Sequence, residues 1–210
     1  MFSELKVREF LEKVASSDPT PGGGSVAAMN VAAGCCCAML MANVTLGKEK
    51  YIQVQNEVQK IVIELTEHKK QALSLMDRDK EAYDSVVMAF KMKKDTDEEK
   101  ELRKKAIFNA NLKATEVPLT ISETAIKVIE YIKRLIEIGN KNAISDSLTG
   151  LFNCYAGSIS SISVAKLNLS GTWADPETKA NLIKKVKNLE LATETALESI
   201  KKIILVNLPS

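Results

Sequence analysis

Two segments of this chain carry no charged side chain, and they constrain the fold more than any other feature. The first spans residues 19–47 and the second spans residues 147–165. Both are rich in small residues, and neither alternates between apolar and polar positions as a half-buried strand would. Because a helix without a charged face belongs inside a domain, we expect two central helices covered by charged amphipathic ones. A dimer interface on one of those faces is the alternative.

The first uncharged segment is also close to the length that crosses a bilayer. However, it opens with three glycines and contains Asn, Ser and Thr, which are unfavourable in hydrocarbon. We therefore favour a buried helix at residues 26–46 over a membrane span. Residues 1–14 mix charged and apolar groups and do not resemble a signal peptide, so a cytoplasmic location is expected.

The rest of the chain shows apolar residues at steps of three and four, which predicts amphipathic helices. Thr96 and Glu99 have the spacing of a capping box, Pro118 predicts a kink or break, and Asp175 before a proline predicts a helix start. The expected helices are 3–16, 26–46, 48–91, 96–117, 121–138, 147–165 and 175–205. The chain is thus expected to form one all-α domain, 1–210, of six or seven helices.

Charge and cysteine content exclude several classes of protein. There are 29 Lys and Arg against 27 Asp and Glu, a net charge of +2, which argues against binding nucleic acid by phosphate neutralisation. The four cysteines are Cys35, Cys36, Cys37 and Cys154. Adjacent helical residues point about 100° apart, so the triplet does not suit zinc, and we expect no metal site. Small buried side chains in a reducing compartment are the simplest interpretation.

A glycine-rich loop precedes the first uncharged helix and is the first candidate site. It contains Pro21, Gly22, Gly23, Gly24 and Ser25. Glycines let a ligand approach the backbone, and a helix start offers free N–H groups to an anion or a carbonyl. The alternative is a tight turn in which Ser25 is the helix N-cap.

The second candidate is an acidic residue on an apolar helix face. Asp79 lies three residues after Met76 and four before Tyr83, on the face expected to be buried, whereas Asp77 lies off that face. A buried carboxyl group must be hydrogen-bonded, paired or functional, and its pKa can rise into the range of a general acid or base. A structural salt bridge is the alternative.

The third candidate is a polar cluster just before the second uncharged helix. It contains Asn140, Asn142, Ser145 and Asp146. These amides, hydroxyl and carboxylate stand at the edge of an apolar core, where they can bind a ligand. Simple helix capping by Ser145 or Asp146 is the alternative.

These blocks together resemble the cyclodeaminase family, which includes the cyclodeaminase domain of formiminotransferase-cyclodeaminase and bacterial methenyltetrahydrofolate cyclohydrolases. The string PTPGGGSVAA at residues 19–28 is the most specific match. Asp77, Asp79 and Tyr83 resemble the family's acidic segment, Lys94 and Thr96 resemble its lysine–threonine block, and residues 139–146 resemble its Gly-Asn block. Three positions depart from the pattern: Lys93 replaces a usual proline, and Ser161 and Ala165 stand where Asn is common.

The resemblance implies an all-helical enzyme that acts on a tetrahydrofolate derivative and needs no cofactor beyond that substrate. It also implies a homodimer or a part of a larger ring. With this chemistry we expect Asp79 to be the principal catalytic acid or base and Asp146 to be a second catalytic carboxylate or an anchor for the pterin ring. The loop residues 21–25, Asn140, Asn142 and Ser145 are expected to bind the substrate. Lys91 and Lys94 would bind the glutamate tail, including a polyglutamate tail.

Two activities in the family fit these residues. The preferred prediction is cyclodeaminase, which converts 5-formimino-tetrahydrofolate to 5,10-methenyl-tetrahydrofolate and ammonia by general acid–base catalysis. The alternative is a cyclohydrolase acting on the methenyl compound. A further alternative is a folate-binding helical dimer without catalysis, and another is a purely structural helical dimer.

Overall fold

The computed structural model describes residues 1–207, which form helices and turns and contain no strand. Short 3₁₀ helices occur at Phe2–Glu4, Glu49–Val54 and Lys141–Ala143. The α-helices are α1 Val7–Val14, α2 Gly23–Thr45, α3 Gln55–Lys91, α4 Asp97–Ile138, α5 Ile144–Asn168 and α6 Pro176–Asn207. The all-α expectation is confirmed, with six α-helices rather than seven.

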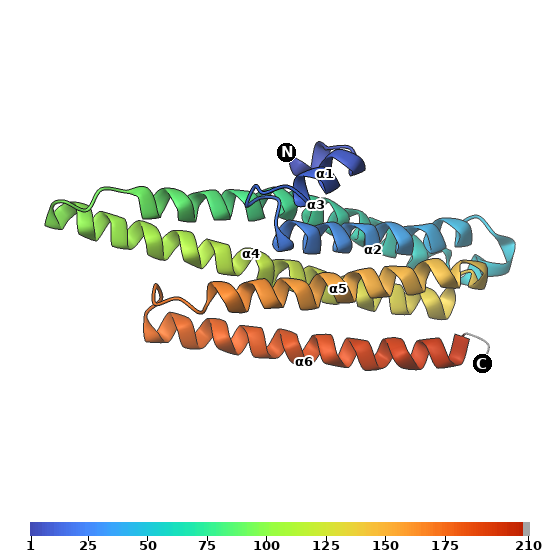
Figure 1. Ribbon diagram of the computed structural model, residues 1–210. Coiled ribbons are helices and arrows are strands. Elements are labelled where there is room, and N and C mark those ends of the chain that lie inside the picture. Colours follow the sequence, from blue (N-terminus) through green and yellow to red (C-terminus); the bar gives the residue numbers. More distant parts are fainter. Residues whose placement is uncertain (208–210) are drawn as a thin grey trace.

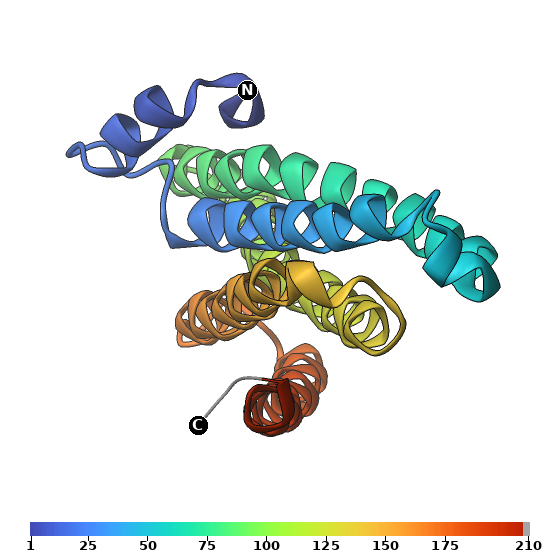
Figure 2. The ribbon, with the colours of Figure 1, turned by 90° about the vertical axis from the view of Figure 1, so that its right-hand side faces the viewer.

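Helices α2 to α5 form an antiparallel bundle in which successive helices reverse direction (Figure 1). Both α2 and α4 pack against α3 and α5, so the four helices close around one core. Helix α6 lies outside the bundle against α4 and α5 (Figure 2). The hairpin of α3 and α4 extends past the start of α2 (Figure 1).

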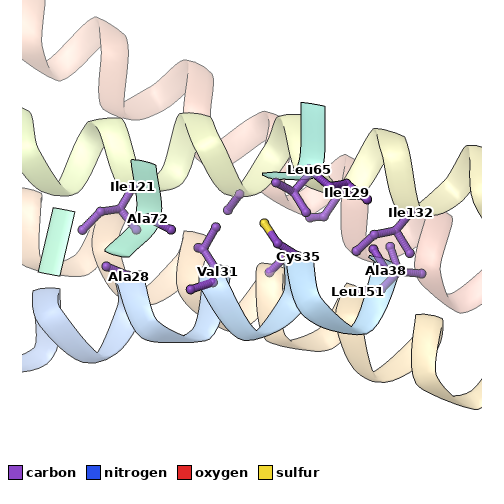
Figure 3. Close-up of a cluster of buried hydrophobic side chains, with 14 of the residues drawn as sticks. Ala28, Val31, Cys35, Ala38, Leu65, Ala72, Ile121, Ile129, Ile132 and Leu151 are labelled. Atoms are coloured by element: carbon purple, nitrogen blue, oxygen red, sulfur yellow. The ribbon is translucent and has the colours of Figure 1, made fainter. Parts of the chain in front are cut away.

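The two uncharged segments form α2 and α5, which pack side by side at the centre of the fold. Figure 3 shows Ala28, Val31 and Cys35 of α2 directed at the apolar side chains of neighbouring helices. By length and composition α2 could cross a membrane, with a mean hydropathy of 1.8, but 56% of its apolar window is buried inside the protein. This burial agrees with the expectation that the segment forms a central helix.

Glycines allow α2 and α5 to approach closely. A Cβ added at Gly34 would lie 2.3 Å from the Cys154 Sγ, and one at Gly157 would lie 2.8 Å from the Ala27 carbonyl oxygen. Because real Cβ atoms do not come so near other atoms, these two positions require glycine for contact rather than for backbone conformation.

The turn between α2 and α3 differs from the expected continuous helix over 48–91. Tyr51 has non-helical angles, φ −112° and ψ 21°, and α3 begins only at Gln55. The Gln55 side chain accepts from the Gly47 N–H at 2.8 Å and donates to the Thr45 carbonyl at 3.2 Å. These hydrogen bonds join Gln55 to the end of α2 and favour a tight connection there over a further helical turn at the start of α3. The first helix is also shorter than predicted, because α1 spans Val7–Val14 rather than residues 3–16.

The expected break at Pro118 is wrong, because α4 runs through it without interruption. A proline inside a helix leaves the carbonyl four residues earlier, here Ala114, without its helical donor. The side-chain amide of Asn168 on α5 donates to that carbonyl at 2.7 Å. A tertiary hydrogen bond therefore replaces the missing helical one.

Of the four cysteines, Cys35 and Cys154 are buried, as expected, but Cys36 is exposed and Cys37 is half-buried. All four are free thiols. Burial raises the pKa of the Cys35 thiol to about 12. Cys35 and Cys154 are thus inert core residues, whereas Cys36 lies on the surface of α2.

Candidate functional site

The site is built where the start of α2 meets the middle of α3. Ser25, in the first turn of α2, points its hydroxyl at Asp79 on α3, with 2.9 Å between the Ser25 Oγ and the Asp79 Oδ2. The same hydroxyl lies 3.1 Å from the Met76 carbonyl oxygen. Gly22 is the helix N-cap, so the interpretation of Ser25 as the cap is wrong. The Ser25 hydroxyl instead donates a hydrogen bond to the Asp79 carboxylate.

The packing around Asp79 explains the third glycine of the loop. A Cβ on Gly24 would lie 2.1 Å from the Asp79 Oδ1, well inside van der Waals contact. Gly23 is different, because the nearest atom to its added Cβ is a Val164 methyl carbon at 3.6 Å. The carboxyl group is thus seated directly against the backbone of the glycine loop.

Burial raises the pKa of the Asp79 carboxyl group, and hydrogen bonds from the Ser25 hydroxyl and N–H partly offset the rise. Within residues 1–207 no Lys or Arg forms a salt bridge with Asp79. The alternative of a structural ion pair therefore fails. A carboxyl group whose pKa is raised in this way is a candidate for exchanging a proton with a ligand.

Asp79 opens into a cavity of about 280 Å³, which we call the Asp79 pocket. Its wall includes the glycine loop, Tyr83 from α3, Asn111 from α4, and Val164 and Asn168 from α5. Because Asn168 is anchored through its amide nitrogen to Ala114, its amide oxygen is left to accept a hydrogen bond in the pocket. Asn111 is held in the same way by the Ile107 carbonyl, at 2.8 Å.

A second cavity of about 790 Å³, the basic groove, shares Asn111 and Asn168 with the Asp79 pocket. Four cationic side chains and two aromatic ones line it, and no acidic residue does. The Arg103 guanidinium lies 5.6 Å from the centre of the Phe90 ring. The cationic and aromatic residues of the groove are Lys94, Lys100, Arg103, Lys104, Phe90 and Trp173.

The structure brings together only part of the predicted site. Gly22, Gly23, Gly24, Ser25 and Asp79 form one cluster, with Lys94 in the adjoining groove. Pro21 is buried next to the loop but does not line the pocket, and Lys91 is exposed and lines neither cavity. Asp77 binds the N-terminal segment, accepting from the Ser3 hydroxyl at 2.7 Å.

The polar cluster of Asn140, Asn142, Ser145 and Asp146 lies at the opposite end of α2. The Asn140 N–H donates to the Thr45 Oγ1 at 2.9 Å, and its side-chain amide donates to the Val44 carbonyl at 3.0 Å. Ser25 and Thr45 are twenty residues apart on one helix, so about 30 Å separates the two clusters. Asn140, rather than Ser145 or Asp146, makes the capping bond, accepting from the Asn142 N–H at 3.1 Å.

Many residues that line the two cavities were not predicted, among them Asn111, Asn168, Arg103, Lys104 and Trp173. They lie on helices or loops without a motif, and only the fold brings them together. The proline at position 118 was the one available signal, because the carbonyl it frees is the one that anchors Asn168.

No group of three His, Cys, Asp or Glu side chains within residues 1–207 is arranged to hold a metal ion. The chemistry that the described residues offer is proton transfer by Asp79, amide hydrogen bonding by Asn111 and Asn168, and anion binding along the basic groove. That combination suits a ligand with a polar ring system at one end and carboxylates at the other.

Replacing Gly24 by Ala should displace the Asp79 carboxyl group, because the new methyl group would occupy its place. We expect kcat to fall by about 100-fold, the size of effect that a displacement near 1 Å produces. Gly23→Ala is the matched control. Its kcat should fall much less, because the new Cβ makes only an ordinary van der Waals contact. Steady-state kinetics with thermal melts of both variants would check this, and equal losses would contradict the steric argument.

Comparisons with known proteins give matches over most of the chain. The formiminotransferase-cyclodeaminase family model matches residues 6–188. A methenyltetrahydrofolate cyclohydrolase of Methylorubrum extorquens is 36% identical over 185 residues, covering 88% of this chain and 86% of the relative. The formimidoyltransferase-cyclodeaminase of Rattus norvegicus is 28% identical, and the match covers 72% of this chain but only 29% of that longer protein.

A solved structure also matches along nearly the whole length. The crystal structure of formiminotetrahydrofolate cyclodeaminase from Thermotoga maritima superposes with a TM-score of 0.85 at 28% identity, covering 97% of both chains.

Proposed function

Because the chain belongs to the formiminotransferase-cyclodeaminase family, an enzyme family of folate one-carbon metabolism, we propose that it is a methenyltetrahydrofolate cyclohydrolase. The supporting observation is the 36% identity over 88% of the chain to a protein of that name. The cyclodeaminase reaction, preferred from the sequence, becomes the second candidate. The 28% identical Thermotoga maritima structure is the observation that favours it.

The pocket supplies what hydrolysis of the methenyl bridge requires. Water adds to the bridging carbon of the cationic substrate, and a base takes a proton from that water as the C–O bond forms. The C–N5 bond then breaks, N5 takes up a proton, and the carbinol oxygen loses one to give the 10-formyl product, with one proton released overall. We assign the base and acid roles to Asp79, whose carboxylate would also stabilise the positive charge of the substrate.

We propose that the substrate tail extends from the Asp79 pocket into the basic groove. The two cavities share Asn111 and Asn168, so a single elongated ligand can occupy both. Carboxylates of one or more glutamates would bind near Lys94, Arg103 and Lys104, while the aromatic ring of the tail would lie along Phe90 and Trp173. This replaces Lys91, proposed from the sequence, with residues of α4.

The test is to mix the purified protein with 5,10-methenyl-tetrahydrofolate and, separately, with 5-formimino-tetrahydrofolate, and to follow the methenyl absorbance. Accelerated loss in the first mixture would support cyclohydrolase. A rise with release of ammonia in the second would support cyclodeaminase instead. No change in either would reject both, and folate binding without turnover would then favour the non-catalytic alternative.

The Ser25 hydrogen bond should set the pH dependence of the reaction. That bond lowers the pKa of Asp79 against the larger effect of burial, so Ser25→Ala should raise the pKa further. If the carboxylate form is the base, the acid limb of kcat moves to higher pH in the variant. A pH profile of kcat for both proteins would check this, and a shift to lower pH would contradict the assigned role.

A further inference from the structure

Pro118 removes one hydrogen bond from α4 without ending the helix, and the carbonyl that it frees has a partner. Pro118 is buried inside a helix of 42 residues. Because proline has no N–H, the Ala114 carbonyl four residues earlier lacks its helical donor, and the proline ring pushes against that carbonyl. The Asn168 side-chain amide on α5 donates to it at 2.7 Å. The proline thus presents one carbonyl of α4 to a neighbouring helix.

Asn168 is held at a second point through its main chain. It is the last residue of α5, where carbonyls have no helical donor. The Trp173 indole N–H donates to the Asn168 carbonyl at 2.8 Å, and the Trp173 ring packs edge-to-face against Phe108 with 5.9 Å between centroids. With its backbone and its amide nitrogen both held, Asn168 keeps its side-chain oxygen at a fixed place in the wall that the Asp79 pocket shares with the basic groove.

Asn111 supplies a second fixed amide oxygen to the same wall. Its side-chain amide donates to the Ile107 carbonyl at 2.8 Å, one turn earlier on α4. Asn111 and Ala114 are three residues apart, so they lie on one face of α4. Asp79 is the only charged side chain among the residues that line the Asp79 pocket. The pocket therefore offers one carboxyl group and two oriented amide oxygens, one from α4 and one from α5.

Two fixed acceptors suit the ring system of the proposed substrate. A tetrahydropterin carries N–H donors on its amino group and on its ring nitrogens, and an amide oxygen is a neutral acceptor for such donors. A site built to hydrogen-bond N–H groups rejects ligands that lack them, because its own polar groups would stay unpaired. An amide that could turn away would discriminate poorly, so the anchor at Ala114 contributes to recognition along with the Asn168 oxygen.

We propose that Asn168 binds the pterin ring through its amide oxygen, and that Pro118 is a positioning residue that acts through Asn168. The ligand assigned to Asn168 rests on the proposed function, whereas the anchor itself does not. In Pro118→Ala the new N–H would bond to the Ala114 carbonyl and draw it back toward the axis of α4, away from Asn168. The helix would gain at the same time, because alanine is strongly favoured over proline inside a helix. Stability and substrate binding should therefore change in opposite directions.

Steady-state kinetics of three variants test the proposal. Asn168→Ala should raise KM about tenfold, the usual value of one lost hydrogen bond. Pro118→Ala should raise KM about 3- to 10-fold with kcat within about threefold, because a bond made equally in the ground state and the transition state affects KM alone. The double variant should match Asn168→Ala within about twofold, since Pro118 then has nothing left to position. Pro118→Ala should melt no lower than the wild type.

Pro176→Ala is the matched control for the proline substitution. Pro176 is the first residue of α6 and is exposed, and at that position a missing N–H frees no helical carbonyl. Its KM should stay at the wild-type value. Three results would overturn the role of Pro118: an unchanged KM in Pro118→Ala, a full additional loss in the double variant, or a lower melting temperature together with a large loss of kcat, which would make the proline merely structural.

An NMR measurement without folate tests the anchor by itself. The Asn168 side-chain amide resonance, identified by its absence in Asn168→Ala, should shift in Pro118→Ala. Trp173 is the only tryptophan of the chain, so its single indole N–H resonance reports on the bond to the Asn168 main chain and should stay in place. An unmoved Asn168 amide resonance would show that Pro118 does not control the anchor, and would reject its positioning role.

Calorimetric titration with 5-formyl-tetrahydrofolate distinguishes failure of this inference from failure of the proposed function. A protein that turns over neither methenyl- nor formimino-tetrahydrofolate, yet binds this probe about tenfold more weakly as Asn168→Ala, would reject the proposed reaction alone. An active wild-type protein whose KM and affinity for the probe are unchanged in Asn168→Ala would reject this inference alone. A protein that is inactive and binds no folate would reject both.

Discussion

Asp79→Asn should lower kcat by about 10²- to 10⁴-fold, the range that general acid–base catalysis contributes. Asn has nearly the same shape and can still accept from the Ser25 hydroxyl, which lies 2.9 Å away in the native protein. Its amide neither takes nor gives up a proton, and it does not balance the charge of a cationic substrate. The fold should therefore survive while turnover is lost, and stopped-flow or steady-state absorbance would measure the loss.

Asp77→Asn is the matched control for this variant. Asp77 lies two residues away on α3 but binds the N-terminal segment and lines neither cavity. Its replacement should leave kcat within about twofold while lowering stability by about 1 kcal/mol, the usual value of a lost hydrogen bond. Wild-type turnover in Asp79→Asn would remove Asp79 from the mechanism.

A binding measurement separates catalysis from affinity in the same experiment. If Asp79 acts mainly on the transition state, the KM of Asp79→Asn should change little while kcat falls. If instead the carboxylate mainly holds the cationic ring, KM should rise with kcat nearly unchanged. The first outcome is the one expected from a half-buried carboxyl group whose pKa is raised by burial.

Local sequence patterns predicted the parts of this molecule that depend on neighbours along the chain. The uncharged segments became α2 and α5, the capping box at Thr96 and Glu99 is present, and Asp175 accepts from the Thr178 N–H at 2.9 Å. The apolar spacing around Asp79 correctly placed it on an inward face of α3. Periodicity determines which side of a helix is buried, and for these elements that was sufficient.

The same patterns could not tell which end of a helix meets which partner. Asp79 and Asp146 were both expected in one site, yet in one chain they lie at opposite ends of α2. Likewise Pro118 does not break α4, because Asn168 from another helix supplies a hydrogen bond that no local rule anticipates. Contacts between distant segments decide both cases, and they depend on the packed bundle rather than on any short stretch of sequence.

Gly34→Ala should destabilise the protein, because the close packing of α2 against α5 leaves no room for an added methyl group. The new Cβ would lie 2.3 Å from the Cys154 Sγ and 3.0 Å from the Gly150 carbonyl oxygen. Cys154 is fully buried and cannot move aside. Overpacking of this kind costs about 1–3 kcal/mol and sometimes more. It should exceed the gain of about 1 kcal/mol in helix propensity from Gly to Ala.

A second substitution shows whether the clash is the cause. Cys154→Ala removes the sulfur that the new methyl group meets, so adding it to Gly34→Ala should recover most of the lost stability, although alone it should destabilise. Denaturant unfolding of the four proteins gives the coupling free energy, which we expect to be favourable by about 1–3 kcal/mol for this contacting pair. If the free-energy changes of the two substitutions simply add, the backbone of α5 rather than Cys154 limits how closely the new methyl group can approach. Gly34 lies in the middle of α2, away from the Asp79 pocket, so kcat per folded molecule should stay unchanged. The same uncharged helix would then show a packing requirement at Gly34 that is separate from the catalytic requirement at its start.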